Sequence, residues 1–274
     1  MADSAHPPDQ RQPLSVDCSV AHSARFWDYL LGGKCNYPVD REIGEQVLAR
    51  DPGLRDSARA DRGFLLRAVR HLVGEAAGIR QFLDIGTGLP TANNTHEVAQ
   101  ATAPECRIVY VDNDPLVLVY ARALLTGTPQ GATTYIHADV RDPDMILQEA
   151  ARTLDFTQPV GIMMLGIINF IMDTDEAHAV VDRLLDAVPS GSYLAMSHPT
   201  AEVNGEAVEE SIRCWNSSGA APIRTRSRQE VVSFFNRLEL LEPGVVPCSW
   251  WRPEPGDLGI PAEVHQYCGV GRKP

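Results

Sequence analysis

Residues 82–91 read FLDIGTGLPT, and this stretch decides the fold of the 274-residue chain. A short apolar run leads into a glycine-rich turn, and a helical pattern follows over residues 92–103. Because glycine has no Cβ, the backbone of such a turn can approach a ligand closely. A strand before the turn and a helix after it predict a nucleotide-type site at the end of the strand.

Apolar runs and helical patterns alternate on the C-terminal side of this turn. After the first strand, residues 81–86, we expect strands at residues 107–112, 133–139, 159–167 and 192–198. Helices are expected between them, at residues 92–103, 115–125, 143–153 and 175–188. Strands that alternate with helices predict a parallel sheet that is covered on both faces.

The C-terminal part has a different pattern. After a helix at residues 228–238, residues 240–251 and 263–272 are expected to form two strands with no helix between them. Two strands joined in this way pair antiparallel. The sequence therefore predicts an α/β fold with a Rossmann-like, seven-stranded mixed sheet, mostly parallel and closed by an antiparallel β-hairpin.

The chain is expected to divide into three regions. Residues 1–18 are polar and proline-rich, which predicts a disordered or loosely attached tail. Residues 19–78 carry amphipathic helical patterns and are predicted to form an N-terminal helical cap. Residues 79–274 are expected to form the α/β core, with a cap insertion near residues 200–226.

Composition and charge exclude several classes of partner. The net charge is −12, which argues against a general nucleic-acid binder and against an anionic membrane as partner. The longest apolar stretch, residues 162–172, is too short to span a bilayer. The six cysteines form no close pair, which favours reduced thiols and a cytoplasmic location.

Acidic residues end the second and third predicted strands. The carboxylate of Asp112 is expected to emerge at the crevice, without an obligatory partner, and to bind a ribose diol. Asp139 ends the next strand, where a carboxylate can meet an adenine amino group. The adjacent Asn113 and Val140 are predicted to line the same site, whereas Asp114 is expected to cap the following helix. Because the acids stand at separate strand ends, no metal site is expected.

These features resemble the class I S-adenosylmethionine-dependent methyltransferases. The resemblance is carried by D-x-G-x-G at residues 84–88, by the acids after strands two and three, and by the closing hairpin. Residues 24–42, ARFWDYLLGGKCNYPVDRE, make it narrower, since they are similar to a bacterial family of S-adenosyl methyltransferases whose substrates are largely unassigned. The resemblance extends from about residue 19 to residue 272.

The resemblance implies S-adenosyl-L-methionine as the cofactor. Residues that match Gly86 and Gly88 bracket its methionine moiety in the family, and Asp84 opens the same motif. The resemblance also gives Asp112 the ribose and Asp139 the adenine. Helices that precede the first strand commonly roof the cofactor in such enzymes, so we predict that Tyr29 and Tyr37 line this roof.

The acceptor is indicated by the segment after strand four, residues 165–173, which reads LGIINFIMD. It lacks the Pro-Pro-Tyr-like motif of many nitrogen-methylating members and is closer to small-molecule O-methyltransferases. We therefore expect methyl transfer to a small-molecule acceptor, at oxygen. His198, at the predicted end of strand five, is the candidate general base.

Two other functions stay open at this point. A G-x-G turn with an acid after strand two is shared with NAD(P)-dependent oxidoreductases, although Thr91 stands where their third glycine would fall. The other alternative is a catalytically idle regulator that binds S-adenosylmethionine, since the sequence offers few candidates for a base.

Overall fold

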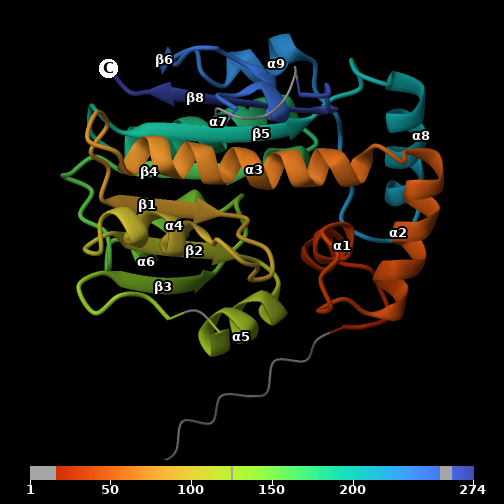
Figure 1. The fold of residues 1–274 in the computed structure, drawn as a ribbon, viewed down its shortest axis with the longest axis horizontal. Coiled ribbons are helices and arrows are strands. Elements are labelled where there is room, and N and C mark those ends of the chain that lie inside the picture. The colour runs from red at the N-terminus through yellow and green to blue at the C-terminus, as the bar shows by residue number, and fades with distance from the viewer. Residues whose placement is uncertain (1–16, 125, 254–260) are drawn as a thin grey trace, which may run out of the picture.

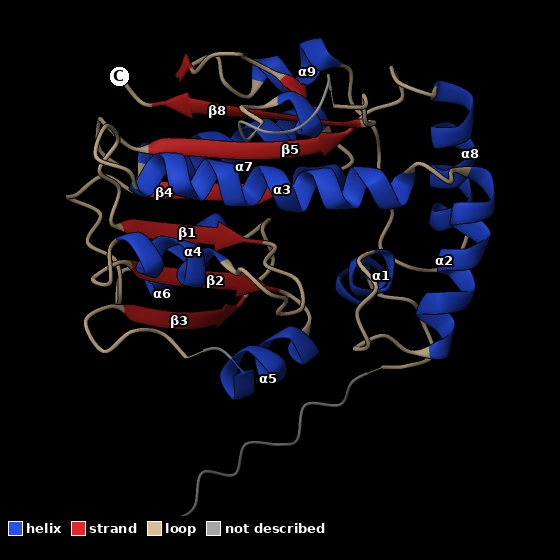
Figure 2. Ribbon diagram, viewed as in Figure 1, coloured by secondary structure: helices blue, strands red, loops and turns tan. Residues whose placement is uncertain are grey.

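The computed structural model describes residues 17–124, 126–253 and 261–274, so the tail predicted for residues 1–18 lies almost entirely outside them. One mixed β-sheet runs through the molecule, with helices on both of its faces (Figure 1, Figure 2). The predicted Rossmann-like α/β fold is confirmed.

Five parallel strands form the sheet in the order β3-β2-β1-β4-β5. Their bounds are β1 (Gln81–Ile85), β2 (Arg107–Asp112), β3 (Ala132–His137), β4 (Gly161–Leu165) and β5 (Tyr193–Pro199). β1 pairs with β2 on one side and β4 on the other, so that Asp84 lies opposite both Tyr110 and Met163. Because the strand order reverses at β1, the loops on its two sides diverge and leave a crevice at the carboxyl ends of the strands.

An antiparallel segment closes the sheet beyond β5. β8 (Gln266–Arg272) pairs with β5, and it also pairs with the short strands β6 (Glu239–Leu240) and β7 (Val246–Pro247). The sheet therefore has eight strands, because the single strand predicted at residues 240–251 is split in two. The break falls at Pro243, which has no N–H to donate, and at Gly244, whose φ is +87°.

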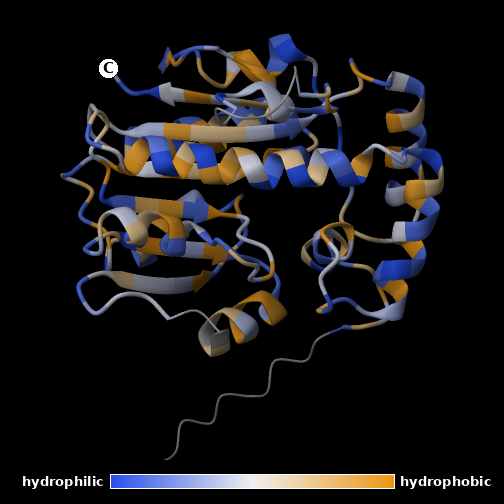
Figure 3. Ribbon diagram, in the orientation of Figure 1, coloured by the Kyte–Doolittle hydropathy of each residue, from blue (hydrophilic) through white to orange (hydrophobic). Residues whose placement is uncertain are grey.

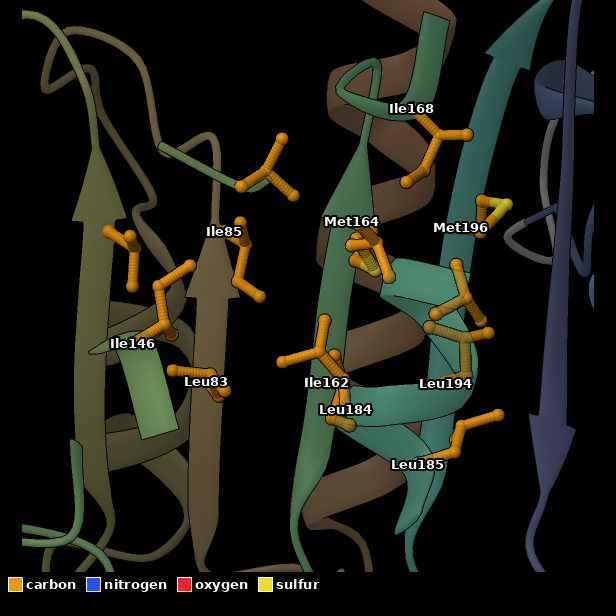
Figure 4. Packing of buried hydrophobic residues seen from close by; sticks show 14 of the residues in the cluster. Leu83, Ile85, Ile146, Ile162, Met164, Ile168, Leu184, Leu185, Leu194 and Met196 are labelled. Carbon is orange, nitrogen blue, oxygen red and sulfur yellow. The ribbon is translucent and has the colours of Figure 1, made fainter. Parts of the chain in front are cut away.

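Helices pack on the two faces of the sheet through separate apolar clusters. One face is covered by α3 (Leu54–Val73) and α4 (Thr95–Thr102). The other is covered by α6 (Pro143–Ala150), α7 (Thr174–Asp186) and α9 (Arg228–Ser233), and Figure 4 shows the side chains that fill this layer. Figure 3 shows α3 in alternating hydrophobic and hydrophilic bands, as expected of a helix with one face on a sheet. α5 (Pro115–Leu124) follows β2 and contacts β3.

A group of helices stands at the carboxyl ends of the parallel strands (Figure 1). It consists of α1 (Ser23–Leu30), α2 (Pro38–Arg50) and α8 (Gly205–Asn216). α8 comes from the insertion predicted near residues 200–226 and packs along α2, while Trp215 contacts Phe26 with ring centroids 4.7 Å apart. α3 differs from the predicted cap of residues 19–78, because Phe64, Leu65 and the following apolar residues pack against the sheet.

No helix in the three described ranges is both long enough and apolar enough to cross a membrane.

Candidate functional site

A cavity of about 180 Å³ opens at the carboxyl ends of β1, β2 and β3, where α1 covers it. Most of the residues that the sequence singles out for the cofactor line it: Asp84, Gly86, Gly88, Asp112, Asn113, Asp139 and Val140. Strand-end residues of three different parallel strands thus meet at one edge of the sheet, as the topology requires.

The glycine-rich turn has the backbone that its sequence predicts. Gly86 and Gly88 have φ values of +78° and +68°, in the left-handed region that favours glycine. A Cβ on Gly86 would lie 2.7 Å from Cδ1 of Ile167, so this glycine is needed for close packing against the segment after β4. A Cβ on Gly88 would meet nothing within 4 Å. The backbone at Gly88 is therefore open to a ligand in the cavity.

Asp112 lines the cavity, but it is not the unpartnered acid that the sequence suggests. Its side chain is buried, and its two oxygens accept backbone hydrogen bonds from Gly88 (2.8 Å) and Asp114 (2.9 Å). Desolvation raises the pKa of Asp112, and these two bonds oppose the shift. Asp114 caps α5 as expected, accepting from Leu116 N at 2.8 Å, and it also pairs with His22 at 3.0 Å. Asp112 therefore ties the end of β2 to the glycine turn of β1.

Asp84, which is buried, and two half-buried residues of α3 form a polar group in the lining of the cavity. Asp84 accepts a hydrogen bond from Thr95 Oγ1 at 2.6 Å, and desolvation raises its pKa to about 6. Burial also raises the pKa of Asp61 to about 6, opposed by hydrogen bonds with Ser197, Cys248 and Gln266. Sequence reasoning missed Asp61, because a charged residue within an amphipathic helix is typical of its solvent-exposed face.

Arg62, the next residue of α3, was missed for the same reason. Its guanidinium donates to the backbone oxygens of Ala92 (3.0 Å) and Asn93 (2.9 Å), at the start of the segment that leads into α4. Burial lowers the pKa of Arg62, and Asp84 opposes this shift. Its Nε is buried and has no hydrogen-bond partner among the described residues. The cavity is thus lined here by two carboxyl groups and one guanidinium group, those of Asp61, Asp84 and Arg62.

Asp139 lines the cavity just beyond the end of β3 and is more exposed than the other strand-end acids. Its side chain is 42% exposed, and it accepts a hydrogen bond from the backbone N–H of Arg141 at 2.9 Å. The neighbouring Val140 is buried, and Asn113 is exposed. This part of the cavity therefore combines a partly exposed carboxylate, which also pairs with the guanidinium of Arg141, with the buried side chain of Val140.

The roof is made by Trp27, and neither Tyr29 nor Tyr37 lines the cavity. Residues two apart on a helix point in nearly opposite directions, so Trp27 and Tyr29 cannot face the same space. Tyr29 lies between Gly44 of α2 and the guanidinium of Arg55, and Tyr37 packs in a separate cluster with Leu116 and Val117. Of the two predicted roof residues, Tyr29 therefore packs within the cap and Tyr37 packs against α5.

His198 is fully buried and does not line the cavity. β5 does not end there but continues to Pro199, and His198 is still paired with Tyr267 of β8. Its Nδ1–H donates to Pro199 O at 2.8 Å, and its Nε2 accepts from Arg226 at 2.8 Å. Burial lowers its pKa to about 3. With both nitrogens occupied, the geometry does not support the predicted role of general base.

The cavity is lined by more acids than bases. Arg62 and Arg141 are its guanidinium groups, against five carboxylates: Asp28, Asp61, Asp84, Asp112 and Asp139. In the part of the chain that the structure describes, no three His, Cys, Asp or Glu side chains are grouped to hold a metal ion. The arrangement suits a ligand that carries positive charge.

Comparisons with known proteins agree with this geometry. A family model described as S-adenosyl methyltransferase matches residues 9–274. A DUF574 family protein from Streptomyces avermitilis is 47% identical, with a TM-score of 0.90 over 95% of this chain and 100% of that one. A Thermobifida fusca protein with a provisional methyltransferase name is 41% identical, with a TM-score of 0.85 over 96% and 98%.

More distant solved structures share the fold alone. Human N-acetylserotonin methyltransferase, solved in complex with S-adenosylmethionine, is 10% identical, with a TM-score of 0.50 over 85% of this chain and 57% of that one. No curated protein matches the chain.

The role of Asp112 in holding the end of β2 to the glycine-rich turn is testable by substitution. Asp112→Ala should lower the free energy of unfolding by about 1–3 kcal/mol, because the N–H groups of Gly88 and Asp114 lose their acceptor. It should also weaken binding of S-adenosylhomocysteine roughly ten- to hundredfold. Chemical denaturation and calorimetric titration measure the two effects.

The matched control is Asp142→Ala, which removes only the cap of α6, a hydrogen bond from Met145 N at 3.1 Å. It should cost about 1 kcal/mol of stability and leave ligand binding unchanged. An Asp112→Ala protein with unaltered stability would contradict this role of Asp112.

Proposed function

Because the chain belongs to the S-adenosyl methyltransferase family, we propose that it transfers a methyl group from S-adenosylmethionine to a hydroxyl oxygen of a small molecule. When bound, the cofactor supplies an electrophilic methyl group, so the protein has to supply positioning and a proton acceptor. The observation that carries the proposal is the acid-lined cavity at the glycine-rich turn.

The residues of the cavity fit this cofactor by charge. S-adenosylmethionine carries a sulfonium and an ammonium group, and both are attracted by a lining of five carboxylates and two guanidinium groups. A nicotinamide dinucleotide carries a diphosphate, which the same carboxylates would repel. The lining therefore favours the methyl donor over the oxidoreductase cofactor that shares the G-x-G turn.

Each part of the cofactor has a counterpart in the cavity. We assign the ribose to Asp112 and Asn113, and the adenine to Asp139 and Val140, with the backbone of Gly88 beneath the ligand. The methionine carboxylate is assigned to Arg62, whose Nε is buried and unpartnered among the described residues. The methionine ammonium is assigned to Asp61 and Asp84.

The surroundings of the cavity support a small-molecule acceptor that is methylated at oxygen. A second, smaller chamber of about 60 Å³ adjoins it and is lined mainly by apolar side chains of α1, α8 and the segment after β4. A nucleic acid or protein acceptor needs an open groove, and a chamber of this kind suits a compact molecule instead. The 165–173 segment has no Pro-Pro-Tyr-like motif to hold an amine.

The assignment of Arg62 makes a direct prediction. Arg62→Met should weaken S-adenosylhomocysteine binding roughly ten- to hundredfold, because a charge-assisted hydrogen bond contributes about 1.5–3 kcal/mol. Arg59→Met is the matched control on the same helix, since Arg59 is exposed and pairs only with Asp56 among the described residues. Equal losses in both variants, measured by calorimetry, would mean that the net charge of α3 matters and the contact does not.

Asp61 and Asp84, which we assign to the methionine ammonium group, make the binding of S-adenosylhomocysteine depend on pH. Asp61 and Asp84 have pKa values of about 6, and their ionised forms attract the ammonium group. As the pH falls through 6, both become protonated and affinity should fall, by up to about tenfold per pH unit for each acid. Titrations between pH 7.5 and 5 should show this slope, and Asp61→Asn should reduce it. A pH-independent affinity would contradict the assignment.

The reaction itself is tested with S-adenosylmethionine that carries a labelled methyl group. Incubated with a mixture of small phenols, alcohols and amines, the protein should transfer the label to an oxygen-containing acceptor. Mass spectrometry of the products locates the labelled atom. Label that appears only on nitrogen would overturn the oxygen part of the proposal, and no transfer by protein that binds the cofactor would favour the idle regulator.

A further inference from the structure

The second chamber contains a pair of ionisable side chains that the cofactor does not need. The chamber shares the lining residues Ser23, Trp27, Gly166 and Phe170 with the first cavity, so the two spaces adjoin. Among the described residues that line it, Asp51 and His265 are the only ionisable ones. An ionisable pair in a mostly apolar chamber next to a reaction centre is a candidate for catalysis.

The two side chains of this pair are in close contact in the wall of the chamber. His265 Nε2 lies 2.9 Å from Asp51 Oδ2, and the two side chains are 4% and 3% exposed. Asp51 forms the C-terminal cap of α2, and the backbone oxygen of His265 accepts from Thr200 N at 3.1 Å, so both residues are held by backbone contacts. Neither of these two atoms has a partner with hydrogen-bond geometry among the described residues, so the contact is electrostatic: a carboxylate this close to Nε2 favours the proton on that nitrogen and leaves Nδ1 as the acceptor. No described residue hydrogen-bonds Nδ1.

A second polar group in the chamber also lacks a partner. Oδ1 of Asn169, in η1 (Ile168–Phe170), is buried and accepts no hydrogen bond from any described residue. Asn169 lines the chamber and is 5% exposed. Buried polar atoms are almost always hydrogen-bonded, so an orphan acceptor in a chamber calls for a ligand that has a donor. A hydroxyl group is such a donor.

We infer that His265 is the general base of this protein, that Asp51 positions it, and that the acceptor is a single-ring phenol. The inference rests on the proposed function. A neutral imidazole can remove a proton from a phenol, whose pKa is near 10, far more readily than from an aliphatic alcohol. Aromatic walls at Phe26, Trp27 and Trp215 suit a flat ring.

The size of the chamber limits the acceptor to one ring. A cavity of roughly 150 Å³ holds a benzene molecule, and this chamber of about 60 Å³ is smaller, so even a single ring must also take up space beside Trp27 and Gly166, which line both cavities. A fused ring system needs still more room than a single ring, so the chamber favours one ring.

The O–H bond of the phenol breaks, and its proton passes to Nδ1 of His265. The imidazolium that results is paired with the carboxylate of Asp51. The oxygen electron pair bonds to the methyl carbon as the bond from that carbon to sulfur breaks, which leaves a neutral thioether. The imidazolium then returns its proton to solvent.

Proton transfer can be observed without turnover. 4-Nitrophenol absorbs visible light only as the phenolate, so protein loaded with S-adenosylhomocysteine should bind it and show the phenolate band at a pH below the pKa of free 4-nitrophenol. In His265→Gln the band should fall at least tenfold, while binding of S-adenosylhomocysteine stays unchanged. Asp51→Asn should weaken the band several-fold, since the imidazolium loses its partner. His71→Gln, a histidine that lines neither space, should leave it unaltered.

Calorimetry of S-adenosylhomocysteine on each variant separates the outcomes. Unchanged affinity also shows that the variant is folded, because the ligand binds only the folded protein. Wild-type protein that binds S-adenosylhomocysteine but shows no phenolate band overturns this inference and leaves the proposed function intact. A band that persists in His265→Gln assigns the base elsewhere. Wild-type protein that fails to bind S-adenosylhomocysteine contradicts the proposed function itself.

Discussion

The reversal of strand order at β1 is the constraint on which the site depends. β2 and β3 lie on one side of β1, and β4 and β5 lie on the other, so the loops at the carboxyl ends separate above β1. The glycine turn is held from both sides of this gap. Asp112 accepts the N–H of Gly88 from the β2 side, and Ile167 packs against Gly86 from the β4 side. The turn is therefore fixed by the fold before a ligand binds.

Desolvated acids give the cavity its selectivity. Desolvation raises the pKa values of Asp61 and Asp84 to about 6, which means that their ionised forms are disfavoured in the ligand-free protein. A cationic ligand restores the lost stabilisation of these carboxylates, whereas an anionic one adds repulsion. The same physical effect explains why a turn shared with dinucleotide-binding proteins can serve a different cofactor.

Sequence reasoning located the strand-end residues because parallel topology fixes where they meet. Asp84, Gly86, Gly88, Asp112 and Asp139 needed only correct strand ends to be brought to one cavity. The helix residues that line the cavity were harder to predict. One helical turn has 3.6 residues, so predicting Tyr29 in place of Trp27 selects the opposite face of α1. Nothing in the local pattern of α3 distinguishes Asp61 and Arg62 from solvent-exposed charges. Likewise, Asp51 and His265 are far apart in the sequence, and only the tertiary fold brings the C-terminal end of α2 to the residue that precedes β8.

The most direct test of the account is the choice of ligand by the cavity. Calorimetric titration of the purified protein with S-adenosylhomocysteine and, separately, with NADH compares the two chemistries that a G-x-G turn serves. The account predicts micromolar-range affinity for S-adenosylhomocysteine and no measurable heat of binding with NADH. Tighter binding of NADH would contradict it, because a diphosphate would then be accepted by a cavity lined with five carboxylates.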